Sequence, residues 1–263
     1  MKTTIRKTII LFLTAFALAG CSKDDEPCDP NNEESPCYAA PSGGMLLLVA
    51  EKQSDFTYKY TYDERNRMVR WDQTVNDGSG SWSFAYDDND RLIALERRDG
   101  SGAVTSQETY TYESDNRPVS GTFSNPGAEE YAVQIQFTYT QNTVTETHVA
   151  ADGVVGNVIT YTFDSNGNIV SEQNQSANGW SNFLVDFGDY DDKSAAHQKW
   201  PFSWKQKWIN NYQSYKSTTV NGIQDHIYEY TYNDAGYPVK AEVYDRATGM
   251  QVATREYTYK KAN

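Results

Sequence analysis

The chain has 263 residues, of which 36 are acidic and 23 are basic, so its formal net charge is −13. A surface of this charge repels the phosphates of nucleic acids, which argues against nucleic acid as a partner. The length fits one all-β domain behind a targeting segment. Twenty tyrosines and only three cysteines make the composition unusual.

Residues 1–20 have the features of an export signal. Basic side chains precede an apolar stretch, residues 9–19, that is too short to span a bilayer. The last four residues of this region, from Leu18 to Cys21, resemble the lipobox of bacterial lipoproteins. That resemblance implies cleavage before Cys21 and lipidation of its side chain. An ordinary secretory peptide is the alternative, and it also predicts an exported protein.

Residues 21–44 are predicted to form a flexible acidic tether, because they are rich in Pro, Asn, Glu and Ser and lack apolar periodicity. Residues 22–26 resemble the acidic tag that directs lipoproteins of Bacteroidota to the outer face of the outer membrane. The resemblance implies a surface-exposed protein that is held to the membrane through Cys21. In an oxidising compartment, a disulfide between Cys28 and Cys37 is favoured over free thiols.

A repeat of about 25 residues fills the remaining segment, residues 45–263. Its copies align on the aromatic residue before a turn: Tyr62, Tyr86, Tyr112, Tyr139, Phe163, Tyr232 and Tyr259. Upstream of this position aromatic or apolar residues occur at every second place, which indicates a strand with one special face. We expect the tyrosine rings to pack as the core while their hydroxyls reach polar partners.

The opposite face of these strands is polar. It carries exposed-type side chains such as Lys59, Gln134, Gln136 and Glu229. A transmembrane barrel needs an apolar band facing the lipid, so this pattern argues against one.

The turns of the repeat share one chemistry. Four residues after the aromatic stands a residue type that tolerates positive φ: Asn66, Asp90, Asn116, Gly167 and Gly236. With a turn-forming side chain such as Asp63 just after the aromatic, this predicts a type I turn closed by a left-handed bulge residue. Seven or eight such hairpins predict 14 to 16 antiparallel strands in one meander. A sheet of that length must curl into a barrel, an open spiral or a folded sandwich.

Four copies resemble the Rhs/YD repeat, namely 60–69, 86–92, 161–169 and 228–239. The chain as a whole resembles the small surface lipoproteins of Bacteroidota that are built from such repeats, over about residues 45–259. In large Rhs proteins these repeats form a spiralling sheet that encloses a toxin, and this chain has no room for one. In shorter surface proteins the repeats are linked to carbohydrate binding or cell contact.

The repeat is interrupted at residues 189–215. This insertion holds aromatic residues at intervals of four: Trp200, Trp204, Trp208 and Tyr212. A short helix beginning near Pro201 would place most of them along one face. They could form an exposed platform that stacks on a glycan or a partner protein. The favoured alternative is a plug that covers an open end of the curled sheet and buries the tryptophans.

Catalytic and metal-binding patterns are weak. His148, His197 and His226 are far apart in the sequence, and we expect each at the surface. An aspartate cluster could hold calcium, as could residues 164–168, although neither completes a twelve-residue calcium loop. The cluster consists of Asp186, Asp189, Asp191 and Asp192. No catalytic residue and no cofactor is predicted.

The sequence therefore predicts a non-enzymatic surface lipoprotein that binds a glycan or a protein through an aromatic surface. The alternative is a structural or assembly component of the outer envelope without a small ligand. A glycan-cleaving enzyme is the third hypothesis, and it requires two carboxylates that face each other across a groove.

Overall fold

The computed structural model describes residues 44–75, 78–128 and 132–263. These ranges contain no α-helix, and therefore no helix that could cross a membrane. They form sixteen strands: β1 (Leu46–Gln53), β2 (Phe56–Tyr62), β3 (Met68–Val75), β4 (Gly78–Tyr86), β5 (Leu92–Asp99), β6 (Val104–Tyr112), β7 (Pro118–Ser124), β8 (Val133–Tyr139), β9 (Thr143–Ala150), β10 (Val155–Phe163), β11 (Ile169–Ser176), β12 (Phe183–Gly188), β13 (Ser214–Thr219), β14 (Gly222–Tyr232), β15 (Pro238–Asp245) and β16 (Gln251–Lys261). The predicted signal and the tether with Cys21, Cys28 and Cys37 lie outside the described residues, except for Gly44.

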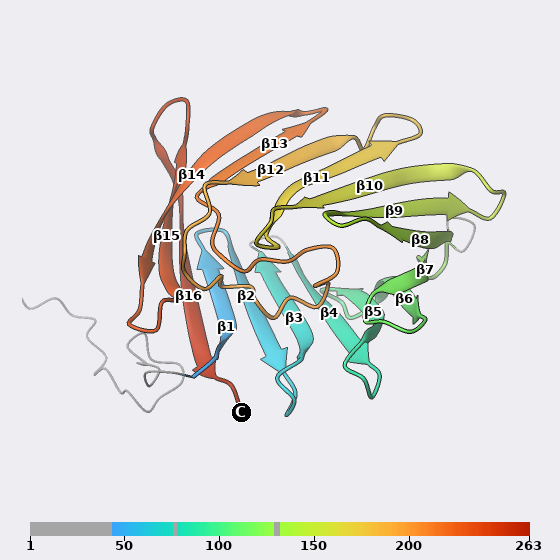
Figure 1. Cartoon of the computed structure of the whole chain (residues 1–263), viewed down its shortest axis with the longest axis horizontal. Coiled ribbons are helices and arrows are strands. Elements are labelled where there is room, and N and C mark those ends of the chain that lie inside the picture. Colours follow the sequence, from blue (N-terminus) through green and yellow to red (C-terminus); the bar gives the residue numbers. More distant parts are fainter. Residues whose placement is uncertain (1–43, 76–77, 129–131) are drawn as a thin grey trace, which may run out of the picture.

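The strands form one closed antiparallel barrel (Figure 1). Every strand pairs with its neighbours in sequence, and β1 closes the ring by pairing with β16, where Glu51 lies opposite Tyr257. The predicted antiparallel meander is confirmed, and its sixteen strands are the upper end of the predicted range. Of the barrel, the open spiral and the folded sandwich, the chain adopts the barrel. Closure leaves no unpaired edge strand.

The predicted turn chemistry is present in the hairpins. Asp63 accepts hydrogen bonds through Oδ1 from the N–H groups of Arg65 and Arg67, at 3.0 and 2.9 Å. Asn66 has a φ of 60°, and the register shifts by one residue directly before Tyr62. Asp90, Gly167 and Gly236 also have positive φ. Asn116 does not: the turn there uses Asp115, which accepts a hydrogen bond from the Arg117 N–H.

A ladder of tyrosine hydroxyls ties most repeats to the one before. The hydroxyl of the aromatic before the turn donates to a backbone carbonyl at the start of the preceding return strand. The rungs are Tyr62 to Leu48, Tyr86 to Met68, Tyr112 to Leu92, Tyr139 to Pro118, Tyr190 to Ile169 and Tyr259 to Pro238. The repeat whose aromatic is Phe163 has no hydroxyl to make this bond.

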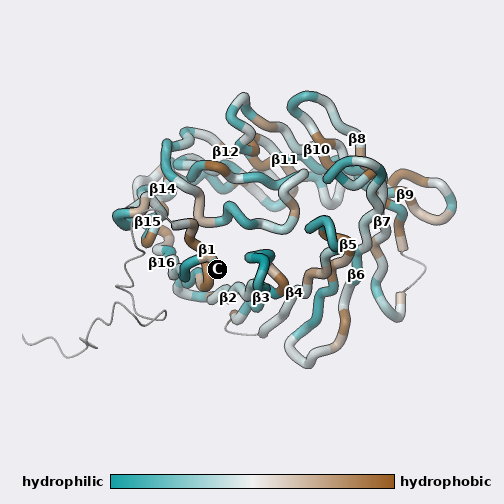
Figure 2. The backbone as a smooth tube through the Cα atoms, turned by 60° about the horizontal axis from the view of Figure 1, so that its bottom comes forward, coloured by the Kyte–Doolittle hydropathy of each residue, from teal (hydrophilic) through white to brown (hydrophobic). Residues whose placement is uncertain are grey.

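The two faces of the wall differ as predicted. The inner face carries a core rich in aromatic rings: Tyr60, Phe84, Tyr110, Phe137, Tyr161, Tyr228, Tyr257 and Tyr259 are all buried. On the outer face Lys59, Gln134, Gln136 and Glu229 are exposed. Figure 2 shows hydrophilic and neutral colours running round the whole wall, with short hydrophobic segments between them.

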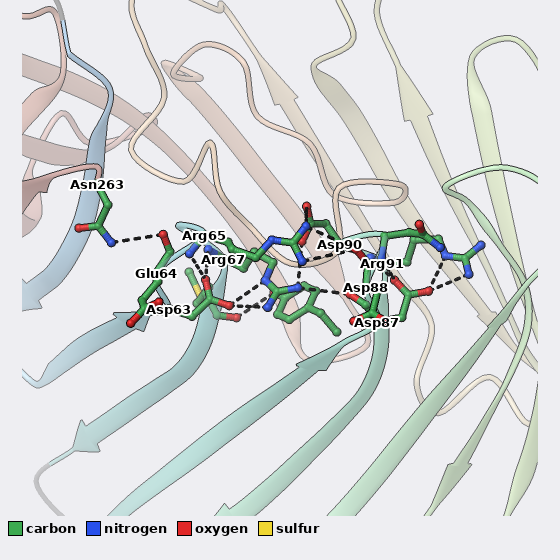
Figure 3. A network of polar contacts seen from close by, with 12 residues as sticks. Asp63, Glu64, Arg65, Arg67, Asp87, Asp88, Asp90, Arg91 and Asn263 are labelled. Carbon is green, nitrogen blue, oxygen red and sulfur yellow. Dashed lines mark hydrogen bonds and ion pairs between the residues drawn. The ribbon is translucent and has the colours of Figure 1, made fainter.

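Charged side chains link neighbouring turns at the rim where these turns lie (Figure 3). Arg67 pairs with Asp63 of its own turn at 2.7 Å and with Asp90 of the next turn at 2.9 Å. Arg65 also reaches Asp90, at 2.6 Å. The guanidinium of Arg67 stacks over the Tyr86 ring, 4.9 Å from its centroid. Each turn is thus held both to itself and to its neighbour.

Candidate functional site

The segment between β12 and β13 enters the barrel and fills part of its interior. In Figure 1 its orange trace crosses the middle of the ring of strands. Residues 189–213 connect the two strands, which agrees with the predicted position of the insertion. We call residues 192–210 the plug. The expected helix is wrong: the segment has only turns, such as the one in which Phe202 O accepts the N–H groups of Lys205 and Gln206.

The plug departs from an otherwise ordinary hairpin turn. Asp191 N donates to Asn211 O at 3.1 Å, as Asp63 N donates to Arg67 O at 3.0 Å. Asp191 Oδ1 also accepts the N–H groups of Lys193 and Asn211, both at 3.0 Å. Residues 191 and 211 therefore occupy the positions that residues four apart occupy in the other turns, and the plug is a lobe inserted between them.

Tertiary contacts explain why the plug does not form a helix. Its backbone groups bond to the neighbouring turn: Asn168 Oδ1 accepts the N–H groups of Ile209 and Asn210, both at 2.9 Å. Ile169 N donates to Lys207 O at 3.0 Å. A helix this short has little stability of its own in water, so these contacts decide the conformation.

The aromatic residues predicted for a ligand platform lie inside the barrel. Trp204 is 8% exposed and packs edge-on against Tyr110, with ring centroids 5.1 Å apart. Trp200 contacts Trp71 of β3 at 5.2 Å. Trp208 and Tyr212 are partly buried against the same core. The structure therefore corresponds to the plug alternative, and these four residues do not form a platform on the outer surface.

A buried ion network holds the plug to β9. Lys205 Nζ lies 2.7 Å from Glu146 Oε2, and His148 Nε2 lies 2.6 Å from Glu146 Oε1. Glu146 is 3% exposed. Burial by itself would raise the pKa of Glu146, but the charge of Lys205 and the hydrogen bonds from His148 and Lys205 outweigh it and lower the pKa to about 2.

A second network holds the other side of the plug to β1 and β16. Glu51, also 3% exposed, lies 3.0 Å from His197 Nε2 of the plug and 3.2 Å from Arg255 Nη1. Burial acts to raise the pKa of Glu51, yet His197 and Arg255 together lower it. The two networks match both buried carboxylates with cations or histidines, which is the condition for tolerating buried charge.

The predicted surface positions of the histidines are wrong. His148 and His197 point into the barrel toward Glu146 and Glu51, and His226 lies on the inner wall beside the Tyr215 ring. The signal was present in part, because the alternating pattern of β9 places Glu146 and His148 on the same face as the buried Val144. Their partners in the plug could not be read from any local pattern.

A groove of about 520 Å³ lies where the plug meets the rim. It is lined by residues 116–117, 139–141, 143–144 and 163–167 of the wall and by Ser203, Trp204 and Lys207 of the plug. Its volume is in the range of small-molecule sites. Aromatic rings, amides and cations line it together. Of the four predicted aromatic residues, Trp204 alone belongs to this lining, and its indole N–H has no hydrogen-bond acceptor in the described residues.

The groove coincides with one of the two breaks in the tyrosine ladder, at Phe163; at the other, the Tyr232 hydroxyl donates to Asp191 instead of a backbone carbonyl. Val144 is paired with Tyr139 as Pro118 is paired with Tyr112, so its carbonyl stands where the next tyrosine hydroxyl would bond. That repeat carries Phe163 instead, and both Val144 and Phe163 line the groove. Phenylalanine at one copy of a tyrosine position is the sequence signal that could have located this site.

The candidate calcium ligands are not brought together. Asp186 lies opposite Lys216 and Ser171 in the strand register on the outer face. Asp191 accepts hydrogen bonds from the Asn211 N–H and the Tyr232 hydroxyl. Asp192 pairs with Lys193. Asp164 accepts two backbone N–H groups of its own turn. Within the described ranges no group of three or more His, Cys, Asp or Glu side chains could hold a metal ion.

Comparisons with known proteins extend the description of the fold. No protein-family model matches the chain, and no curated protein sequence matches it. A porin-like protein from Bacteroides uniformis is similar in structure, with 15% identity over 84% of this chain and 100% of the other, and a TM-score of 0.51. A porin-like protein from Bacteroides vulgatus has 12% identity over 82% and 99% of the two chains, with a TM-score of 0.43. At 15% identity, the first similarity shows a shared fold.

Proposed function

We propose that this protein is a non-enzymatic, surface-anchored barrel that binds a glycan in the groove at the edge of the plug. The observation that carries the proposal is the composition of the groove. Tyr139, Phe163 and Trp204 offer ring faces and edges, and Asn116 and Gln141 offer amide donors and acceptors. Sugars present both C–H faces and hydroxyls, so this combination suits them.

The rest of the molecule supports a binding scaffold. The wall is closed and its interior holds the plug, so the groove is framed by elements whose positions are fixed by packing. Rigid framing lowers the entropic cost of binding. The polar outer face fits a barrel that stands in water, and the resemblance of residues 18–21 to a lipobox supplies the anchor. The YD-repeat resemblance favours a cell-surface role of this kind.

A structural role in the envelope is the second candidate. It is favoured by the rim, where Arg65 and Arg67 of one turn both pair with Asp90 of the next, a linkage that a partner could extend. Catalysis has less support, because the deeply buried Glu51 and Glu146 are committed to ion pairs with Arg255 and Lys205.

Glycan-array binding followed by calorimetry on the purified protein tests the proposal. Ser203→Trp places a large ring in the groove from an exposed position. It should weaken binding at least ~10-fold, the equivalent of about 1.4 kcal/mol. Lys199→Trp is the matched control, because Lys199 is an exposed plug residue outside the groove.

Each outcome separates two of the candidates. Binding that is lost in Ser203→Trp and kept in Lys199→Trp supports the proposed site. If the protein binds no glycan on the array, the structural role is favoured. Release of shorter sugars from a bound glycan would instead revive the enzyme hypothesis.

A further inference from the structure

We propose that the glycan bound in the groove carries an acidic group, such as a uronate carboxylate or a sulfate, and that Lys207 is the residue that recognises it. This inference rests on the proposed function and adds the chemical class of the ligand. It follows from Lys207, a cation in the lining of the groove that forms no ion pair within the described residues.

The lining of the groove contains cations although the protein as a whole is acidic. The chain has a formal net charge of −13, yet the groove is lined by two cations, Arg117 and Lys207, and by one carboxylate, Asp164. The carboxylate is already committed. Its Oδ1 accepts the N–H groups of Asn166 and Asn168, both at 2.9 Å, and its Oδ2 faces the Asn168 amide. Arg117 is already paired with Asp115 outside the lining, so Lys207 is the lining cation without an ion pair in the described residues.

Lys207 is placed to meet a ligand and has no protein counter-charge. Its backbone is fixed, because Lys207 O accepts the hydrogen bond from Ile169 N. Its side chain is exposed, and no ion pair of Lys207 occurs in the described part of the chain. By contrast, the less exposed cations at the plug and inner wall, Lys205 and Arg255, are both paired with carboxylates.

The turn that contains Gly167 lies close to the end of the Lys207 side chain. Gly167 has a φ of 86°, and a Cβ at this residue would lie 3.7 Å from Lys207 Nζ and 3.4 Å from Ile209 Cδ1. Glycine meets the backbone requirement and also keeps that volume empty.

Arg117 contributes a second, ion-paired cation to the groove. Its guanidinium stacks over the Tyr139 ring, 4.6 Å from the centroid, and pairs with the exposed Asp115 at 3.1 Å. Arg117 and Tyr139 both line the groove. The stacked cation and ring together offer a surface for a sugar whose acidic group reaches Lys207.

The test compares neutral glycans with their uronate-containing or sulfated counterparts on one array, using wild-type protein, Lys207→Met and Lys199→Met. Lys199 is the matched control because it is an exposed plug lysine outside the groove. We expect wild type to prefer the acidic member of a pair at least ~10-fold, and Lys207→Met to lose that preference. Lys199→Met should behave as wild type, and added salt should weaken acidic-glycan binding alone.

Three results would overturn the inference. If neutral and acidic glycans bind equally, or if Lys207→Met keeps the preference, the acidic specificity fails while the glycan-binding proposal stands. If neither class binds, both fail. Melting temperatures of the three proteins confirm that the comparison is between folded molecules.

Discussion

The wall and the plug are stabilised in different ways. In the wall the hairpins are held by bonds between residues a few positions apart, such as Asp63 with Arg67. In most repeats a tyrosine hydroxyl also bonds to the preceding repeat, as Tyr86 does to Met68, 18 positions earlier. In the plug the bonds join residues far apart: Lys205 and Glu146 are separated by 59 positions, and His197 and Glu51 by 146.

Interactions in the wall are local and repeat in most copies, whereas interactions in the plug depend on the interior of the closed barrel. Wall contacts recur from copy to copy, so when one contact is lost the equivalent contacts in the neighbouring repeats still hold the wall. Plug contacts occur once, are buried, and have no substitute. We therefore expect substitutions in the plug to cost more than substitutions in the wall.

Trp204→Ala tests the largest of these effects. The ring packs against Tyr110, Phe137 and Phe202, so its removal leaves a cavity in the core. The free energy of unfolding should fall by ~3–5 kcal/mol in chemical denaturation. Trp180→Ala is the control, because Trp180 is 80% exposed and its loss should change stability by less than ~0.5 kcal/mol. Equal effects of the two would show that the plug is not part of the core.

The second-largest expected effect is a loss of stability in acid, because the ion pair that holds the plug to β9 contains Glu146. The pKa of Glu146 falls from 4.5 to about 2 on folding, so the native state favours its ionised form. The associated stability, about 3 kcal/mol, is present above pH ~4.5 and is lost as the pH falls from there toward 2. The lowered pKa of Glu51 acts in the same direction.

Denaturation curves between pH 7 and pH 2.5 measure this dependence. The double variant Glu146→Gln/Lys205→Met removes both charges and should have a shallower slope than wild type over the acidic range. Parallel slopes would mean that the pair does not contribute to the acid response.

Single rungs of the tyrosine ladder should have moderate effects. Tyr86→Phe removes the 2.8 Å bond to Met68 O but keeps the ring under Arg67, so it should cost ~1 kcal/mol. Phe163→Tyr supplies the missing hydroxyl beside Val144 and should stabilise the barrel by up to ~1 kcal/mol. The added hydroxyl also occupies the groove, so glycan binding should weaken. A stabilised Phe163→Tyr protein with unchanged binding would place the ligand elsewhere.

The exposed ion pairs of the rim should matter least. Arg65 and Asp90 are each 48% exposed in their side chains, and Asp90 keeps its second partner, Arg67, when Arg65 is removed. Arg65→Ala should change the unfolding free energy by ~0–0.5 kcal/mol, and added salt should erase the difference. A loss above ~2 kcal/mol would show that the rim network is a structural element comparable to the plug.

The local features of the barrel were open to sequence analysis. Alternating side chains, the Asp63-type turn and the positive-φ position Asn66 act within a few residues, so their pattern predicts strands, bulges and the number of hairpins. The insertion was located because it interrupts that pattern. Among the residues that line the groove, Trp204 stands out in the sequence as part of the insertion, and Phe163 as a phenylalanine at a tyrosine position. Their spacing in the sequence does not predict that they lie near Lys207 or Arg117.

The sequence by itself determined the repeated hairpin and the aromatic inner face, because each copy contains the interactions that shape it. Only the tertiary structure decided that β1 meets β16, that the plug is irregular instead of helical, and that Glu146 and Glu51 lie buried beside Lys205 and His197. These features depend on contacts between distant residues inside a closed barrel. Such contacts override local helix preference and make buried charge tolerable through partners that no local pattern reveals.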